Sequence, residues 1–505
     1  MITEILRDEY WWGGNVHDGA DMPYHSKSSA KIDLRCPSPN QSASLFLSSK
    51  GRYIYGEEPF CIQFENGIIK ADGARLYVAG STLKDAYIAA VKNHIGVSGT
   101  IPDGLFFTMP QYNTWIALNH NQTQNGVLNY AEEIVRLKLP PGILMIDACW
   151  ERYFGELDFD RSRFPDPKGM TDILHGMGFK VMLWVSPCIS PDSAVFRELR
   201  NTPVLLHDKN GEPAVRKWWD GYSAVLDLTC PEAQQWFESR LNRLMNEYGA
   251  DGFKLDAGDS YFYKADDKAY KPGSPQSQTH AFADFAKRFP LNELRTGWNN
   301  GGSPCVFRLA DKHHSWDGYG LNMLLPNTFV QGLLGYTYCC PDMIGGGEYM
   351  QFNKSADSLD KELFVRYAQV AALMPMMQFS ALPSCLKNCE AEKMIADAAE
   401  LHRKLGGYIL KTAQNSAKTG EPVMRHMCYS YPDCGFETVN GQFMLGNDIL
   451  AAPVLEKGAV EKQVALPPGQ WLYVPGGTTY EGGTTVTVPA PLDVPVWFKK
   501  LEGEM

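Results

Sequence analysis

Short stretches in which apolar and polar residues alternate fill the N-terminal part of the chain. The segments SLFLSS (44–49), RYIYGEE (52–58) and ARLYVAG (74–80) show this two-residue period, and Gly, Pro and Asn residues separate them. Alternation with turn residues between the runs is typical of antiparallel strands. It predicts an N-terminal β-sandwich domain over residues 1–97.

From residue 104 the pattern changes to short apolar runs that alternate with stretches of helical periodicity. The runs are GLFFTMP (104–110), GILMID (142–147), FKVMLWV (179–185), AVLDL (224–228), GFKLD (252–256), NELRTG (292–297), CVFRLA (305–310), YTYCCPD (336–342) and LMPMMQFS (373–380). Eight or nine strands with helices between them are the pattern of a parallel barrel. We therefore predict the α/β class, with a catalytic (β/α)8 TIM barrel over residues 98–408.

After a helical stretch near residues 390–410 the alternating pattern returns. It runs through QFMLGNDILAAPV (442–454), KQVALPPGQWLYV (462–474) and TTVTVPAPLDVPVWF (484–498). The short strands and the Gly and Pro turns between them predict a C-terminal β-sandwich domain over residues 409–505.

Acidic residues outnumber basic ones, with 58 Asp and Glu against 47 Lys and Arg and a net charge of −11. No basic run interrupts this acidic surface, so we expect no nucleic-acid partner. The N-terminal sequence MITEILRDEYWWGG has no basic segment followed by an apolar one, and no stretch approaches the roughly 20 apolar residues of a membrane span. The sequence predicts a cytoplasmic protein that does not enter a membrane.

The twelve cysteines are scattered along the chain. Neither the adjacent pair Cys339 and Cys340 nor the spacing of Cys385 and Cys389 has a second half that would complete a zinc site. We expect these side chains to be reduced thiols, and we expect no metal site.

Charged side chains follow several of the predicted barrel strands. In such barrels the carboxyl ends of the strands meet at one shared pocket. Asp256 ends the run GFKLD, and the other strands supply Asp147, Arg295, Asp311 and Asp342. Tryptophans are also abundant in the barrel segment: Trp115, Trp150, Trp184, Trp219, Trp298 and Trp316. Because paired carboxylates can hydrolyse glycosidic bonds and indole faces stack on sugar rings, the pattern favours a sugar-binding pocket.

Each of these residues also has a simpler interpretation. A single Asp at a strand end is often a helix cap or the acceptor of a loop hydrogen bond. Most tryptophans pack in cores, as we expect for Trp236 on its predicted helix. Asp259 could cap a short helix, and Lys254, on the same strand face as Asp256, could be its ion-pair partner. From the residues alone, we predict a barrel enzyme whose pocket is lined by acidic and aromatic side chains.

Five segments of the chain resemble glycoside hydrolase family 31, the retaining α-glycosidases. They are IDACWERYFGELDFDRSRFPDP (146–167), KWWDGYSAVLDLTCPEAQQWF (217–237), GFKLDAGD (252–259), DKHHSW (311–316) and PDMIGG (341–346). The resemblance extends over nearly the whole chain. It is nearest to the branch of the myogenesis-regulating glycosidase and its bacterial relatives, in which the nucleophile segment reads Asp-Ala-Gly-acid. That branch is associated with α-galactosidase activity.

The resemblance implies a role for each predicted site residue. Asp256 falls at the catalytic nucleophile and Asp311 at the general acid/base, with Asp317 as the competing candidate for the second role. Residues that fall where the family holds the sugar are Asp147, Trp219 and Arg295, with Trp115, Trp150, Trp184 and Asp342 as nearby candidates. We add Lys254 and Trp298 to this predicted site. The implied reaction is a double displacement that retains the sugar configuration and uses no metal or organic cofactor.

Two departures from the family pattern bear on the sugar. The family's α-glucosidases carry a histidine near the end of the last barrel strand, where this chain has Ser380, and their nucleophile segment usually has Asn-Glu in place of Gly-Asp. Both differences favour α-galactosidase activity. The alternative is α-glucosidase or α-xylosidase activity. The N-terminal domain is short for the family, so a second subunit could supply a loop of the pocket, which leaves a homo-oligomer open.

The expected partner is an oligosaccharide or glycoside substrate, and three other functions compete with its hydrolysis. One is a catalytically silent sugar-binding protein, which both candidate carboxylates argue against. The second is transglycosylation, in which an acceptor sugar replaces water. The third is an aldolase with Lys254 in a Schiff base, although the sequence has no phosphate-binding glycine loop to accompany it.

Overall fold

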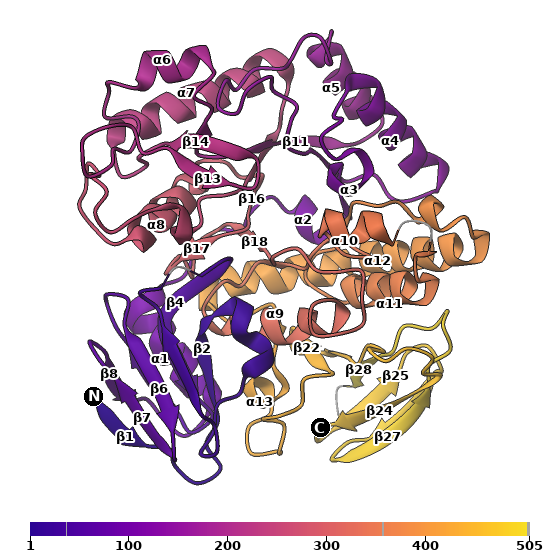
Figure 1. Cartoon of the computed structure of the whole chain (residues 1–505). Helices are drawn as coiled ribbons and strands as arrows, with labels where there is room; N and C mark the ends of the chain where they lie inside the picture. Colours follow the sequence, from indigo (N-terminus) through magenta and orange to yellow (C-terminus); the bar gives the residue numbers. More distant parts are fainter. Residues whose placement is uncertain (37, 356–357, 502–505) are drawn as a thin grey trace.

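The computed structural model describes residues 1–36, 38–355 and 358–501, which form a barrel and two flanking β domains (Figure 1). The barrel occupies the middle of the chain. The N-terminal domain (indigo) and the C-terminal domain (yellow) lie next to each other on one side of it in this view. The predicted fold class, a (β/α)8 barrel between two β domains, is confirmed.

Eight parallel strands form the barrel sheet in the order β19-β18-β16-β15-β11-β10-β9-β20. Their bounds are β9 Gln111–Asn113, β10 Ile143–Ile146, β11 Lys180–Val185, β15 Gly252–Leu255, β16 Asn292–Leu294, β18 Val306–Arg308, β19 Cys339–Cys340 and β20 Gln378–Phe379. A backbone hydrogen bond from Ile344 N to Gln378 O, 2.8 Å long, bridges the gap between the segment after β19 and β20. The sheet is therefore nearly closed, and its strand ends face one opening.

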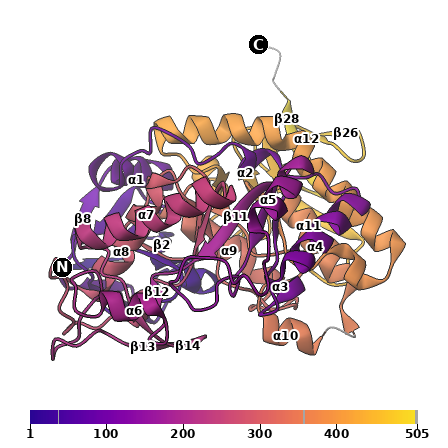
Figure 2. The same ribbon diagram turned by 90° about the horizontal axis from the view of Figure 1, so that it is seen from above.

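Helices surround this sheet, as Figures 1 and 2 show. They are α2 Leu105–Thr108, α3 Trp115–Leu118, α4 Gln124–Arg136, α5 Pro167–Gly176, α6 Ala194–Leu199, α7 Pro231–Tyr248, α8 Pro275–Phe285, α9 Leu324–Leu333, α10 Tyr349–Lys354, α11 Lys361–Ala372 and α12 Cys389–Thr419. Helix α7 shows why such segments are helical: Pro231 fits the first turn, and Gly249 ends the helix in the left-handed conformation with φ 78°. The predicted domain boundary at residue 408 falls inside α12 and stays a prediction.

The N-terminal domain contains two sheets, of orders β1-β7-β6-β3 and β17-β4-β5-β8, with β2 paired to β4. Their strands are β1 Ile2–Glu4, β2 Trp11–Asn15, β3 Ala30–Asp33, β4 Gln41–Ser48, β5 Arg52–Tyr55, β6 Cys61–Glu65, β7 Ile68–Ala71, β8 Arg75–Val78 and β17 Gly297–Trp298. Helix α1 Leu83–Ala90 follows them. Strand β17 comes from the barrel segment and pairs in parallel with β4, so barrel and N-terminal domain share a sheet.

The C-terminal domain has a six-stranded sheet, β21-β22-β23-β28-β25-β26, and a two-stranded sheet, β24-β27. The strands are β21 Met424–Arg425, β22 Phe443–Leu445, β23 Ile449–Ala451, β24 Glu461–Leu466, β25 Gln470–Tyr473, β26 Thr478–Glu481, β27 Thr484–Pro489 and β28 Trp497–Leu501. The buried Arg366 of α11 donates from Nη2 to the Ala490 carbonyl oxygen at 2.7 Å. This bond ties the domain to the barrel.

Two of the predicted barrel strands are wrong. Residues 105–108 in GLFFTMP form the single helical turn α2, and the first barrel strand is the more polar β9 just after it. The run AVLDL belongs in part to β14 (Gly221–Val225), which lies in a small antiparallel sheet with β12 (Cys188–Ile189) and β13 (Arg216–Trp218). This hairpin rises from the barrel rim and brings Trp219 and its neighbours to the pocket.

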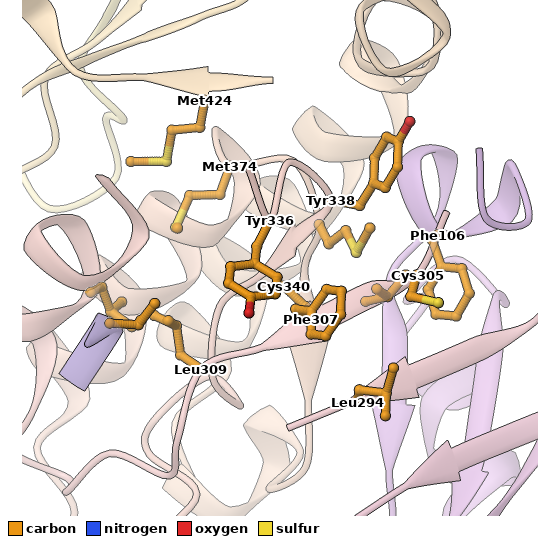
Figure 3. Close-up of a cluster of buried hydrophobic side chains, with 14 of the residues drawn as sticks. Phe106, Leu294, Cys305, Phe307, Leu309, Tyr336, Tyr338, Cys340, Met374 and Met424 are labelled. Carbon is orange, nitrogen blue, oxygen red and sulfur yellow. The ribbon is translucent and has the colours of Figure 1, made fainter. Parts of the chain in front are cut away.

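Buried apolar, tyrosine and thiol side chains form a cluster around strands β16, β18 and β19 (Figure 3). The labelled side chains are Phe106, Leu294, Cys305, Phe307, Leu309, Tyr336, Tyr338, Cys340, Met374 and Met424. Burial raises the pKa of Cys305 to about 12, which makes its thiol unreactive. All twelve cysteines are free thiols in the structure.

Within the segments that the structure describes, none of the helices has the length and apolar character needed to cross a membrane. The same segments contain no group of three or more His, Cys, Asp or Glu side chains arranged to hold a metal ion.

Candidate active site

The backbone turns sharply just after Asp256, at the end of β15. Asp256 N still donates to Val185 O at 2.9 Å, as a strand residue would. Ala257 and Gly258 then adopt the left-handed region, with φ 57° and 76°. A Cβ on Gly258 would lie 2.4 Å from the Phe282 ring, so only glycine fits there. The turn leaves the Asp256 carboxylate at the mouth of the barrel.

Three side chains fix the Asp256 carboxylate. Arg295 Nε donates to Oδ1 at 2.9 Å, Trp184 Nε1 donates to Oδ2 at 3.0 Å, and Lys254 Nζ lies 3.9 Å from Oδ2. Burial alone would raise the pKa of Asp256, but the charges of Arg295, Lys254 and Arg308 outweigh it and hold that pKa well below its usual range. Asp256 is therefore ionised, as a nucleophile must be.

Asp147, at the end of β10, is the main partner of Lys254. Nζ of Lys254 lies 2.7 Å from Oδ2 of Asp147, nearer than to Asp256. Burial lowers the pKa of Lys254, but the charges of Asp147, Asp256 and Glu293 together outweigh it and the net shift is upward. A lysine held as an ammonium cannot form a Schiff base, so this contact argues against the aldolase interpretation.

Asp259 binds an arginine instead of capping a helix. It stands at the start of a short 3-10 helix (Ser260–Phe262) but makes no side-chain cap bond there. Its carboxylate accepts from Arg295 Nη2 and, at 3.3 Å, from Asn40 N of the N-terminal domain. The Asp-Ala-Gly-Asp segment thus supplies two carboxylates to Arg295, at positions 256 and 259.

Asp311 follows β18 and is the more exposed of the two candidate catalytic carboxyls, with 37% of its side chain accessible. Arg308 Nη1 donates to Asp311 Oδ1 at 2.8 Å and to Asp342 Oδ1 at 2.9 Å. Asp342 is fully buried and also accepts from the backbone N–H groups of Lys312 and Gly347. Burial and the charge of Asp311 raise the pKa of Asp342. Arg308 lines the pocket and Asp342 does not, so Asp342 lies behind Arg308 as seen from the pocket.

The competing candidate, Asp317, lies in a surface turn. Its Oδ1 accepts from Ser315 Oγ at 2.7 Å and from Tyr319 N at 2.9 Å, and the Ser315 bond contributes most to lowering its pKa. Trp316 Nε1 donates to Asp360 Oδ2 at 2.9 Å. Neither Asp317 nor Trp316 lines the pocket that Asp311 lines.

A pocket of about 350 Å³ opens at the strand ends. It brings together eight of the eleven site residues expected from the sequence: Trp115, Asp147, Trp184, Trp219, Lys254, Asp256, Arg295 and Asp311. Three others lie outside its lining: Trp150, Trp298 and Asp342. The indole of Trp150 is fully buried and donates to Trp184 O at 2.7 Å, so it supports the wall from behind. Trp298 lies in β17 against the N-terminal domain.

Ser380, which replaces the family's histidine, is also buried. Its Oγ accepts from Ile116 N at 2.6 Å and so anchors α3. It is not part of the pocket lining.

The pocket also contains residues that the sequence reasoning missed. These are His120, Ala148, Asp220, Tyr261, Arg308, Ala310, Met343, Glu348, Tyr349 and Met350. Most of them lie on loops after the strands, where no periodicity marks them. Asp220 had a usable signal, because it directly follows Trp219 in the segment KWWDG.

Two family models match this chain. The model described as the TIM-barrel domain of glycosyl hydrolases family 31 matches residues 108–409, and that of the family's C-terminal domain matches residues 420–501. The myogenesis-regulating glycosidase of Mus musculus is 33% identical over 83% of this chain and 60% of its own length. The α-xylosidase XylQ of Lactiplantibacillus pentosus is 24% identical over 87% of this chain and 60% of its own length.

A solved structure of the Flavobacterium johnsoniae dextranase, complexed with glucose, superposes with a TM-score of 0.86 at 22% identity and covers 99% of this chain and 66% of that one. This likeness shows the shared fold. This chain spans at most about 60% of the length of the curated relatives it matches first. The family model alone covers more than half of the residues, and so the chain belongs to glycosyl hydrolase family 31.

Proposed function

We propose that the protein is a retaining, exo-acting α-glycoside hydrolase with Asp256 as nucleophile and Asp311 as general acid/base. The observation that carries this proposal is the state of Asp256: it is held ionised by Arg295 and Lys254 in a pocket that Asp311 also lines. A retaining glycosidase needs two such carboxyl groups, one to attack and one to transfer a proton.

The reaction proceeds in two displacements. A carboxylate oxygen of Asp256 bonds to the anomeric carbon while the bond from that carbon to the leaving oxygen breaks, and Asp311 gives its proton to that oxygen. Asp311, now a carboxylate, takes a proton from water as the water oxygen attacks the anomeric carbon and releases Asp256. Two inversions give a product with the configuration of the substrate. If an acceptor sugar replaces water, the same steps give transglycosylation.

The substrate that we favour is a terminal α-galactoside, with an α-glucoside or α-xyloside as the alternative. Support comes from the Asp-Ala-Gly-acid segment, in which the second acid, Asp259, holds Arg295 beside the nucleophile. The absence of the glucosidase-type histidine at Ser380 points the same way. The free thiols support our expectation that the protein works in the reducing cytoplasm.

A panel of aryl α-glycosides tests the sugar: the galactoside, glucoside, xyloside and N-acetylgalactosaminide. The galactoside should have the highest kcat/KM, at least about tenfold above the glucoside, which needs roughly 1.4 kcal/mol of differential transition-state binding. An equal or reversed preference would replace the α-galactosidase proposal by the α-glucosidase or α-xylosidase one.

Nuclear magnetic resonance of the first product formed tests retention, because the α-anomer should appear before mutarotation. A β-anomer would contradict the double displacement. Sugar binding without any turnover would point to a silent binding protein, and new glycosides formed with added acceptor sugars would reveal transglycosylation.

A further inference from the structure

Asp220 is a pocket residue to which neither the sequence patterns nor the family resemblance gave a role. It lies at the turn between β13 and β14 and lines the same pocket as Asp147 and Asp256. Its side chain is only 13% exposed. His120 Nε2 lies 3.3 Å from Oδ1 and is the partner of that oxygen.

The other carboxylate oxygen of Asp220 lacks a partner. Oδ2 is buried and makes no hydrogen bond to any residue that the structure describes. An unpaired buried acceptor is unfavourable, because it has lost its water without gaining a donor. Because the Asp220 side chain lines the pocket, a small rotation of its carboxylate would present this unused acceptor to a ligand.

The electrostatic neighbours of Asp220 locate it within the pocket. Burial raises its pKa most, His120 opposes that shift, and the charges of Asp147 and Asp256 add to it. Asp311 belongs to a different group, bound to Arg308 beside Asp342. Asp220 therefore lies near Asp147 and Asp256, whereas Arg308 is the partner of Asp311.

A pyranose in this pocket has one orientation compatible with the chemistry. Its anomeric carbon must meet Asp256 and Asp311, so the leaving group extends past Asp311. Carbon 4, with the hydroxymethyl group on carbon 5 next to it, is the end of the ring remote from the anomeric carbon. Asp220 lines the pocket without being either of these two carboxyls, so it is free to contact this end of the ring.

We propose that Asp220 is a specificity-determining residue whose Oδ2 accepts a hydrogen bond from the hydroxyl on carbon 4 or carbon 6 of the bound sugar. The inference rests on the proposed function and extends it to one hydroxyl of the substrate. His120 acts as a positioning residue, because its bond to Oδ1 fixes the orientation of the Asp220 carboxylate. Lys254 and Arg295 already pair with carboxylates, so neither cation is the missing donor to Oδ2. A neutral sugar hydroxyl can be that donor.

The test combines a side-chain deletion with a hydroxyl deletion. Wild type and Asp220→Ala are assayed on the best aryl α-glycoside of the panel and on its 4-deoxy and 6-deoxy forms. Asp220→Ala should lower kcat/KM on the parent by about 30-fold or more, and wild type should lose a similar factor on one of the deoxy sugars. On that sugar the variant should lose little more, because the two deletions remove the same bond.

Two further variants separate recognition from structure. Asp397→Asn removes an exposed carboxylate that pairs with Lys393 on the surface and should leave all rates unchanged. His120→Gln should weaken activity on the parent less than Asp220→Ala does and should keep the same preference for the hydroxyl. The inference is overturned if Asp220→Ala matches wild type on the parent, or if its loss multiplies with the loss on both deoxy sugars.

Calorimetry distinguishes failure of this inference from failure of the proposed hydrolase. If wild type hydrolyses no α-glycoside, the free sugar and its 4-deoxy and 6-deoxy forms are titrated into wild type and Asp220→Ala. The role of Asp220 would be supported, in a protein that is not a hydrolase, if the variant binds the parent more weakly than wild type does but binds one of the two deoxy sugars equally well. Equal binding by both proteins, or binding of none of these sugars, would overturn the inference.

Discussion

Nη1 of Arg308 lies 2.8 Å from Oδ1 of Asp311, so the candidate acid/base carboxyl is oriented by a buried arginine. The same guanidinium donates to Asp342 and lies 3.4 Å from Glu293, two carboxyls with no exposed surface. The Arg308 side chain thus connects the candidate acid/base, Asp311, to two buried carboxyls. We therefore expect Arg308 to act on the proposed reaction through Asp311, as a positioning residue.

Replacing Arg308 should lower kcat/KM to different extents for substrates with poor and with good leaving groups. A lysine has one ammonium group and cannot reproduce the fork to Asp311 and Asp342. Arg308→Lys should therefore lower kcat/KM strongly for substrates with poor leaving groups and only weakly for a dinitrophenyl glycoside, which needs no proton. Arg308→Met also leaves two buried carboxyls without their cation and should lose about 3–5 kcal/mol of unfolding free energy. Equal rate losses on both kinds of leaving group would contradict the positioning role.

Asp256→Asn should abolish hydrolysis of every α-glycoside and leave the fold intact. The amide keeps an oxygen for Trp184 or Arg295 but cannot attack the anomeric carbon. Turnover is measured on protein shown by mass spectrometry to be free of deamidated chains, and circular dichroism checks the fold. Substantial residual activity in such a sample would remove Asp256 from the nucleophile role.

Asp311→Ala should be slow on poor leaving groups and much less impaired in forming the glycosyl-enzyme from an aryl or fluoride substrate. Azide needs no general base, so its addition should restore the second step and give an α-glycosyl azide. Asp317→Ala is the matched variant and should behave like wild type, because its carboxylate lies in a surface turn. If only Asp317→Ala shows azide rescue, the acid/base is Asp317.

Two buried histidines should make the protein sensitive to acid. Burial lowers the pKa of His402 and of His426 to about 4. The unfolded chain takes up these protons near pH 6.5, whereas the folded chain resists them until about pH 4. Their contribution to stability is therefore complete above pH 6.5 and is lost as the pH falls toward 4, by up to about 1.4 kcal/mol per pH unit for each histidine.

Urea unfolding at pH 7, 5.5 and 4.5 measures this dependence. His402→Gln should show a smaller loss of unfolding free energy across this range than wild type. His25→Gln, at a partly exposed position, should keep the wild-type slope. An unchanged slope in His402→Gln would show that this imidazole takes no part in acid unfolding.

Hydrophobic runs predicted the barrel where its strands are apolar throughout. GILMID, FKVMLWV and GFKLD contain β10, β11 and β15, which are buried on both faces. Strand β9 was missed because it reads Gln-Tyr-Asn: its Gln111 is buried, but it accepts a hydrogen bond from Gln378 at 3.0 Å inside the barrel. AVLDL was misassigned because a rim hairpin can be as apolar as a barrel strand.

The residues of the candidate site also divide into those that the sequence could predict and those that it could not. Asp147, Asp256 and Asp311 could be predicted because strand ends have a fixed place in a barrel. His120 could not, and neither could its contact with Asp220, because loops from distant parts of the chain bring the two together and only the folded geometry relates them. Trp150 shows the converse: the resemblance made it a candidate for the predicted site, yet its indole is buried in the core.

The contact between β4 and the barrel has a consequence for the energetics of the whole chain. Asn40 Nδ2 and Gln41 Nε2 both donate to the carbonyl oxygens of Arg295 and Arg308, the two arginines that hold the candidate catalytic carboxyls. A ligand that makes this arginine geometry more favourable must also stabilise β4 against opening, by thermodynamic linkage. Amide hydrogens of β4 should therefore exchange more slowly when the pocket is filled, which makes the N-terminal domain a reporter of sugar binding.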